Sequence, residues 1–64
     1  MTVNGNRYDH RAGLTLHGLL DELQVDQRLV VVMHGDEIYR AGKIPDAPLA
    51  ERDIVEIVTM AQGG

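Results

Sequence analysis

The chain has 64 residues, with six basic and ten acidic side chains, a formal net charge of -4 and no cysteine. At this length folding buries only about 60% of the surface of the unfolded chain, so the core must be compact and a deep internal active site is not expected. The absence of cysteine excludes a disulfide framework and thiolate metal ligands, and it fits a reducing compartment.

Charge and hydropathy exclude two further classes of protein. The basic residues are scattered from Arg7 to Arg52 and form no stripe, which disfavours binding to nucleic acid. No stretch approaches the roughly 20 apolar residues that span a membrane, and the first residues have no signal-peptide pattern. We therefore expect a soluble, cytoplasmic protein whose acidic surface favours a basic partner.

The first pattern along the chain is that of a β-hairpin. Met1 and Val3 alternate with polar neighbours, and the pair Asn4-Gly5 suits a two-residue turn because both central positions of a type I′ turn need positive φ. Residues 6–10 can return as the second strand. The sequence therefore predicts that the chain opens with a hairpin.

The second pattern is helical. Thr15 is the predicted N-cap, and Gly18 occupies the place of a capping-box glutamate, where it costs about 1 kcal/mol relative to alanine. Packing must therefore hold this helix. Its apolar stripe has the spacing i, i+3, i+4 and i+7, and its members are Leu16, Leu19, Leu20 and Leu23.

Two strands and an irregular segment come next. Residues 29–33 are β-branched and apolar, so they predict a central strand, which turns at Gly35 into a shorter strand over residues 37–39. Residues 40–49 contain glycine and prolines without a sustained period, and they predict an irregular crossing that Ile44 and Leu49 pin to the core.

The last strand is predicted over residues 53–60. Side chains alternate between the two faces of a strand, so one face carries Val55 and Ile57, and the other carries Ile54, Glu56, Val58 and Met60. The whole order indicates an α+β fold in which a single helix covers one face of a sheet. Residues 1–60 are expected to form one domain and residues 61–64 a flexible tail, while the pattern leaves the strand order open.

Five motifs in this order carry a resemblance to a known family. They are the Val3-Asn4-Gly5 turn, the Thr15-Leu16 helix start, the Val30-Val31-Val32 strand before Gly35, the strand over residues 53–58, and Gly63-Gly64. Together they resemble the ThiS-like sulfur carriers of thiamine biosynthesis, over essentially the whole chain. The resemblance implies a ubiquitin-like β-grasp fold with a mixed sheet.

The chain departs from the family pattern in two turns. Glu51-Arg52-Asp53 stands where the family usually has Asp-Gly-Asp, which places an arginine where glycine would accept positive φ easily. His34-Gly35 stands where the family tends to have Asn-Gly. The first change predicts a local difference in the turn, and the second keeps the turn glycine.

The resemblance also implies a chemistry for the C-terminal tail. The protein would be no enzyme itself and would bind no cofactor. A ThiF-like adenylating enzyme would use ATP to activate the Gly64 carboxylate, a persulfide donor would convert it to a thiocarboxylate, and thiazole synthase would receive the sulfur. Gly63 would leave room for the partner's backbone beside the reacting group. The simplest alternative is a frayed terminus, which is the commonest role of terminal glycines.

A recognition surface is predicted beside the tail. Val58 and Met60 face away from the core face of the last strand, and Val30 and Val32 would join them if the central strand pairs with the last one. Gln62 is the remaining expected contact. In the alternative, Val30 and Val32 belong to the core and the outward residues are Leu29, Val31 and Met33; the first arrangement is preferred here.

Other candidate sites receive little support. His10, His17 and His34 have no cysteine partner and no i, i+4 histidine pair, so we expect solvated or turn histidines and no metal site. Two different functions remain open beside the thiamine assignment. The same tail could serve molybdopterin, cysteine or methionine synthesis, or the chain could be a ubiquitin-like binding module that is never activated. In each case we expect a monomer when free.

Overall fold

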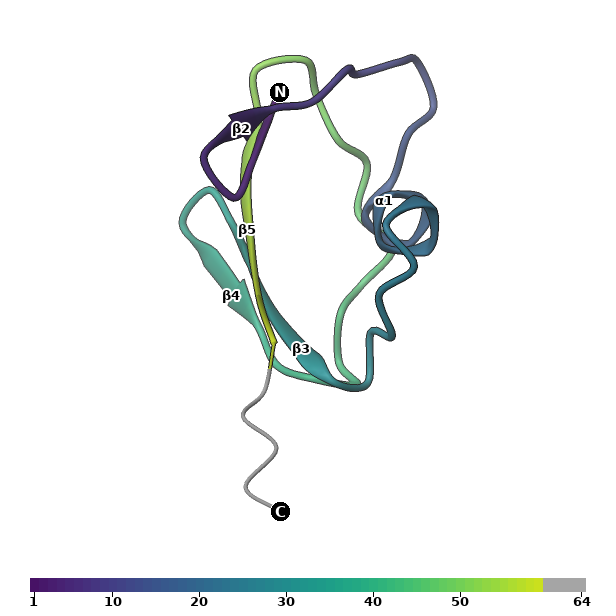
Figure 1. Ribbon diagram of the computed structural model, residues 1–64, viewed down its shortest axis with the longest axis vertical. Coiled ribbons are helices and arrows are strands. Elements are labelled where there is room, and N and C mark those ends of the chain that lie inside the picture. Colours follow the sequence, from purple (N-terminus) through teal and green to yellow (C-terminus); the bar gives the residue numbers. More distant parts are fainter. Residues whose placement is uncertain (60–64) are drawn as a thin grey trace.

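The computed structural model of the chain describes residues 1–59. They form a five-stranded mixed sheet with one helix against one of its faces (Figure 1). The strand order is β2-β1-β5-β3-β4, and β1 is parallel to β5 while the other pairs are antiparallel. This is the arrangement that the resemblance implied. The elements are β1 (Thr2–Val3), β2 (Asn6–Arg7), α1 (Leu16–Glu22), β3 (Val30–His34), β4 (Glu37–Tyr39) and β5 (Ile54–Thr59).

The opening hairpin has the predicted turn but shorter strands. Asn4 and Gly5 both have positive φ, 52° and 81°, as a type I′ turn requires. Asn4 has a second role, because its Oδ1 accepts a hydrogen bond of 2.6 Å from the backbone N–H of Ile57. The turn residue thus extends the contact between the hairpin and β5 beyond the two residues of β1.

Helix α1 begins as the sequence predicts and ends in a way that it does not. Thr15 is the N-cap, and its hydroxyl accepts a hydrogen bond of 3.2 Å from the N–H of Gly18. At the other end Gln24 adopts φ 58°, and the N–H of Val25 reaches back to the carbonyl of Leu20. This is a Schellman motif with glutamine in the position that glycine usually takes, so no glycine marked it in the sequence.

The core lies between α1 and the covered face of the sheet. The predicted stripe is confirmed: Leu16, Leu19 and Leu20 are buried, and Leu23 packs at the edge. The crossing is pinned as expected by Ile44 and Leu49, and the sheet also contributes Val3, Val30, Val32 and Val55, with Leu14 completing the buried set. Ile57 is half-buried against it.

The crossing between β4 and β5 is tied down by histidines. His10 Nε2 lies 2.8 Å from the carbonyl oxygen of Leu49, and His17 Nε2 lies 2.6 Å from that of Ile44. Both histidines are partly buried. A ring N–H donated to each of these carbonyl oxygens gives it a hydrogen-bond partner where the irregular backbone has no neighbouring strand. The expectation of solvated histidines was wrong, because sequence spacing does not show which loop packs against which element.

Candidate functional site

The predicted chemical site falls mostly beyond the described residues. Met60, Gln62, Gly63 and Gly64 lie outside residues 1–59, as does the predicted boundary between domain and tail, and these expectations therefore stay predictions. Among the described residues of the candidate site, Val58 lies on β5, the strand that leads to the tail. Strand β5 is therefore the part of the candidate site that the structure describes.

Strand β5 is held on both sides. It pairs in parallel with β1 at its start, where Ile54 is opposite Thr2, and antiparallel with β3 from Val55 to Thr59, where Val30 is opposite Thr59. Figure 1 shows β5 running through the sheet, away from the end of the molecule at which the N-terminus lies. Thr59, the last described residue, is thus held in the sheet by its pairing with Val30.

The start of β5 is fixed by a hydrogen-bonded carboxylate. Asp53 Oδ2 accepts hydrogen bonds from the backbone N–H of Ala50, at 2.8 Å, and from His34 Nε2, at 2.7 Å. These two bonds, the first being the stronger influence, lower the pKa of Asp53 from its ordinary value. The same contact explains why arginine is accepted at position 52, where the family usually has glycine. Arg52 has no positive φ, and the Asp53 carboxylate closes the turn through its hydrogen bond with Ala50.

The predicted recognition surface was placed on the wrong face for two of its residues. Val30 is 1% exposed and Val32 is 0% exposed, and both belong to the core under α1. Residues directly opposite one another in an antiparallel pair share a face, and the residue opposite Val58 is Val31. An all-apolar strand has no alternation to reveal its inward phase, so the sequence could not distinguish the two arrangements.

The uncovered face of the sheet carries an apolar patch. We call it the outer-face patch, and it comprises Val31, Met33, Ile38, Ile54 and Val58. Ile38, Ile54 and Val58 are 68%, 60% and 49% exposed, which is unusual for three large apolar side chains on one small surface. The sequence predicted that Val58 belongs to the recognition surface, whereas Val31 and Met33 faced outward only in the alternative arrangement. Ile38 was missed, although its strand was predicted.

One charged side chain lies within the patch. Glu56 is exposed and points to the same face, with Met33 directly opposite on β3 and with Ile54 and Val58 two residues away on its own strand. Within residues 1–59 the ion pairs are Arg11 with Glu22, Arg28 with Asp26, and two histidine–aspartate contacts, and Glu56 takes part in none of them. The candidate surface is therefore an apolar face that contains one carboxylate.

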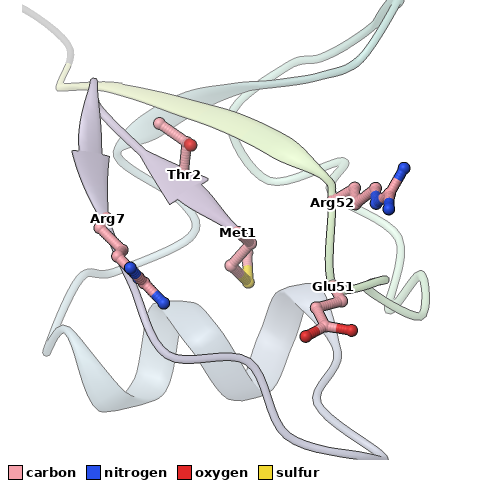
Figure 2. A pocket seen from close by; sticks show the side chains of 5 residues that line it. All are labelled: Met1, Thr2, Arg7, Glu51 and Arg52. Carbon is pink, nitrogen blue, oxygen red and sulfur yellow. The ribbon is translucent and has the colours of Figure 1, made fainter.

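A surface pocket of about 490 Å³ lies beside the first strand. Figure 2 shows Met1 and Thr2 between Arg7 on one side and Glu51 with Arg52 on the other, and the Arg52 side chain points away from the rest. Cationic and anionic groups are mixed here. The pocket borders the start of β5, at the end of that strand opposite to Thr59.

The remaining titratable groups serve local structure. The pKa of Asp26 is lowered to about 2 by side-chain and backbone hydrogen bonds from Arg28 in an exposed turn. The pKa of Asp46 is lowered by a hydrogen bond from the Thr15 hydroxyl and by one from the backbone N–H of His17. Over residues 1–59 the structure contains no group of three histidine or acidic side chains arranged to hold a metal ion.

Comparison with known proteins agrees with this geometry. A model described as the ThiS family matches residues 1–64. The chain is also 38% identical over 52 residues to the sulfur carrier protein ThiS of Thermus thermophilus, a match that covers 81% of each chain. The chain belongs to the ThiS family. Both the sequence resemblance and the β-grasp fold are thereby confirmed.

Membership in the ThiS family assigns a coarse role. ThiS proteins are small sulfur carriers and not catalysts, so the chain is a carrier protein of this kind. None of the helices in residues 1–59 is long and apolar enough to cross a membrane.

Proposed function

We propose that this ThiS-family chain carries sulfur for the synthesis of the thiazole of thiamine, as a thiocarboxylate on Gly64. The observation that carries the proposal is that a ThiS-family model matches residues 1–64, a range that includes Gly63 and Gly64, together with a relative named as a sulfur carrier. The finer steps follow from the chemistry of a terminal carboxylate.

The first step needs no base from this protein. A terminal carboxylate has a pKa of about 3.3–3.7, so at neutral pH it is already an anionic oxygen nucleophile. The Gly64 carboxylate attacks the α-phosphorus of ATP bound to a ThiF-like enzyme, and pyrophosphate leaves to give an acyl-adenylate. The terminal sulfur of a persulfide donor then attacks the acyl carbon and displaces AMP, which gives an acyl disulfide. A thiol cleaves its S–S bond, so that the thiocarboxylate is released and the donor's sulfur remains in a disulfide with that thiol, and the thiocarboxylate then passes its sulfur to thiazole synthase. The carrier itself holds no cofactor, and we assign these reactions to the cytoplasm.

The fold supports a separation between docking and chemistry. Residues 60–64 follow a strand whose last residue, Thr59, is still paired with Val30, so the body can dock while the following residues extend into a partner. Five residues span at most about 17–18 Å at 3.3–3.6 Å each, which is enough to enter an enzyme's pocket. Glycine at the last two positions lets the partner's backbone approach from both sides.

The outer-face patch supports recognition by the partner. Val58 is 49% exposed and lies near the end of β5, so a partner that receives the tail meets this face at the same time. Apolar area of this kind is the usual centre of a protein interface, where a few buried contacts supply most of the affinity. The patch therefore supports docking on the adenylating enzyme through the sheet and not through α1.

Pyrophosphate exchange with the cognate adenylating enzyme tests the proposal. Deletion of Gly64, addition of one residue after it, or Gly63→Val should abolish exchange, while the melting temperature should barely change. Gly18→Ala is a matched control, because a Cβ there would meet Thr15 Oγ1 at 3.4 Å and Leu14 Cδ1 at 3.6 Å, which are ordinary contacts. That variant should keep full exchange. Normal exchange by the lengthened chain would refute the proposed chemistry.

A further inference from the structure

The position of Glu56 is unusual for a carboxylate on a docking face. It lies within the outer-face patch, on the β5 side of it, with Met33 directly opposite on β3 and with Ile54 and Val58 before and after it on the same face. In the free protein its exposure to water keeps the charge solvated. A partner that covers the apolar neighbours must also cover this carboxylate.

Covering an ionised carboxylate is unfavourable unless the partner replaces its hydration. An unpaired charge in an apolar contact loses its water without compensation, and a pair with a cation restores most of what is lost. Within residues 1–59 no cation forms an ion pair with Glu56 that could accompany it into an interface. The compensating charge must therefore come from the partner.

A second copy of this chain would not supply that charge. A twofold contact between two outer faces brings the same surface of each copy together and so places the two Glu56 carboxylates near one another. Each chain also carries a formal net charge of -4, which adds to the repulsion. Charge complementarity instead indicates a basic partner surface.

We infer that the outer-face patch docks on an apolar surface of the adenylating enzyme that presents an arginine or lysine to Glu56. This inference rests on the proposed function and adds to it the residue that determines which charge the partner must present. Arginine suits the position best, because its planar guanidinium can bind both carboxylate oxygens while its flat faces pack against apolar side chains. Glu56 is thus a specificity residue that rejects enzymes with a neutral or acidic residue at this point.

Steady-state pyrophosphate exchange with the cognate enzyme, with the full-length carrier as the varied substrate, tests this inference. Glu56→Lys should raise the KM for the carrier roughly tenfold or more, and Glu56→Gln should raise it by a smaller factor, because the amide keeps the shape and loses the charge. The kcat at saturating carrier should stay within about twofold, since the tail chemistry is untouched. Added salt should raise the KM of the original protein more than that of Glu56→Gln.

Glu37→Lys is the matched control. Glu37 is exposed on β4, but its partner in the ladder is His34, which lies on the helix side of the sheet opposite Val55. The substitution makes the same change in net charge away from the outer-face patch, so its KM should stay close to that of the original. Equal increases in KM for Glu37→Lys and Glu56→Lys would mean that the change in net charge explains the whole effect, and this result would overturn the inference.

The other outcomes separate this inference from the proposed function. If the original protein supports exchange and the Glu56 variants have an unchanged KM, the inference is wrong and the carrier proposal stands. If the original protein supports no exchange at all, the carrier proposal fails and this inference fails with it. Sedimentation of the free chain provides a further check, since a dimer that Glu56→Lys strengthens or breaks would assign the outer face to a second copy.

Discussion

Two adjacent valines on β3 should respond very differently to truncation. Val32 is 0% exposed and lies under α1, whereas Val31 lies on the outer face opposite Val58. Val32→Ala removes two methyl-sized groups, which is about 1.6 kcal/mol at roughly 0.8 kcal/mol each, and the cavity left behind brings the expected loss of unfolding free energy to about 2–3 kcal/mol. Val31→Ala leaves no enclosed cavity and should cost less than about 1 kcal/mol.

Urea denaturation of the two variants measures this difference. A chain of this length is expected to have about 3–10 kcal/mol of stability, so the Val32 variant should lose a large fraction of it. Because a domain of 60–100 residues loses about 4–8 °C in Tm for each kcal/mol, its melting temperature should fall by about 8–24 °C. An equal or larger loss for Val31→Ala would show that the faces of β3 have been assigned wrongly, and the outer-face patch would have to be redrawn.

Three further variants test separate parts of the structure. Gln24→Gly should raise the unfolding free energy by about 0.5–1 kcal/mol, because glycine relieves a left-handed conformation at φ 58°, and a loss in urea denaturation would refute the strain. The folded-state pKa of Asp53 is below its unfolded value. The associated stability is therefore fully present above about pH 4, and it is lost as the pH falls from there through the lowered folded-state pKa. Asp53→Asn should flatten that part of the pH–stability curve, while the exposed control Asp36→Asn should not, and indistinguishable curves would contradict the assignment. Val58→Asp should weaken binding to the adenylating enzyme at least tenfold in a titration with little change in Tm, and unchanged affinity would exclude the patch from recognition.

Local patterns predicted the elements well where the physics is local. The leucine stripe with its Thr15 cap and the Asn4-Gly5 turn needed only backbone sterics and amphipathic spacing, and both are present as expected. The Gln24 cap was not predictable, since glutamine carries no preference for positive φ. Surrounding packing selects that conformation against the residue's own tendency, and sequence spacing does not contain this information.

The candidate surface shows a different limit. In β5 the alternation of Glu56 with apolar residues reveals which face is covered, and that face was predicted correctly. In β3 every residue from Val30 to Met33 is apolar, so both phases fit the pattern equally. Only the register, with Val31 opposite Val58, decides between them, and register depends on contacts between segments far apart in the chain.

The histidines illustrate the same dependence on distant contacts. His10 and His17 each lie close to a carbonyl oxygen of the crossing, whose path is irregular and cannot be deduced from periodicity. His34 meets Asp53 from a strand 19 residues earlier in the chain. Their predicted lack of a metal role rested on spacing, but their actual structural role depends on tertiary packing.

Intact-mass analysis tests the central claim most directly. The purified chain is incubated with its adenylating enzyme, ATP, a persulfide sulfur donor and a thiol reductant, and the products are fragmented to locate any change of mass. The account predicts that one oxygen is replaced by sulfur at Gly64 and that the replacement is absent when ATP is omitted. An unmodified Gly64, in a mixture where the enzyme demonstrably adenylates another carrier, would contradict the claim that this chain carries sulfur on its terminal carboxylate.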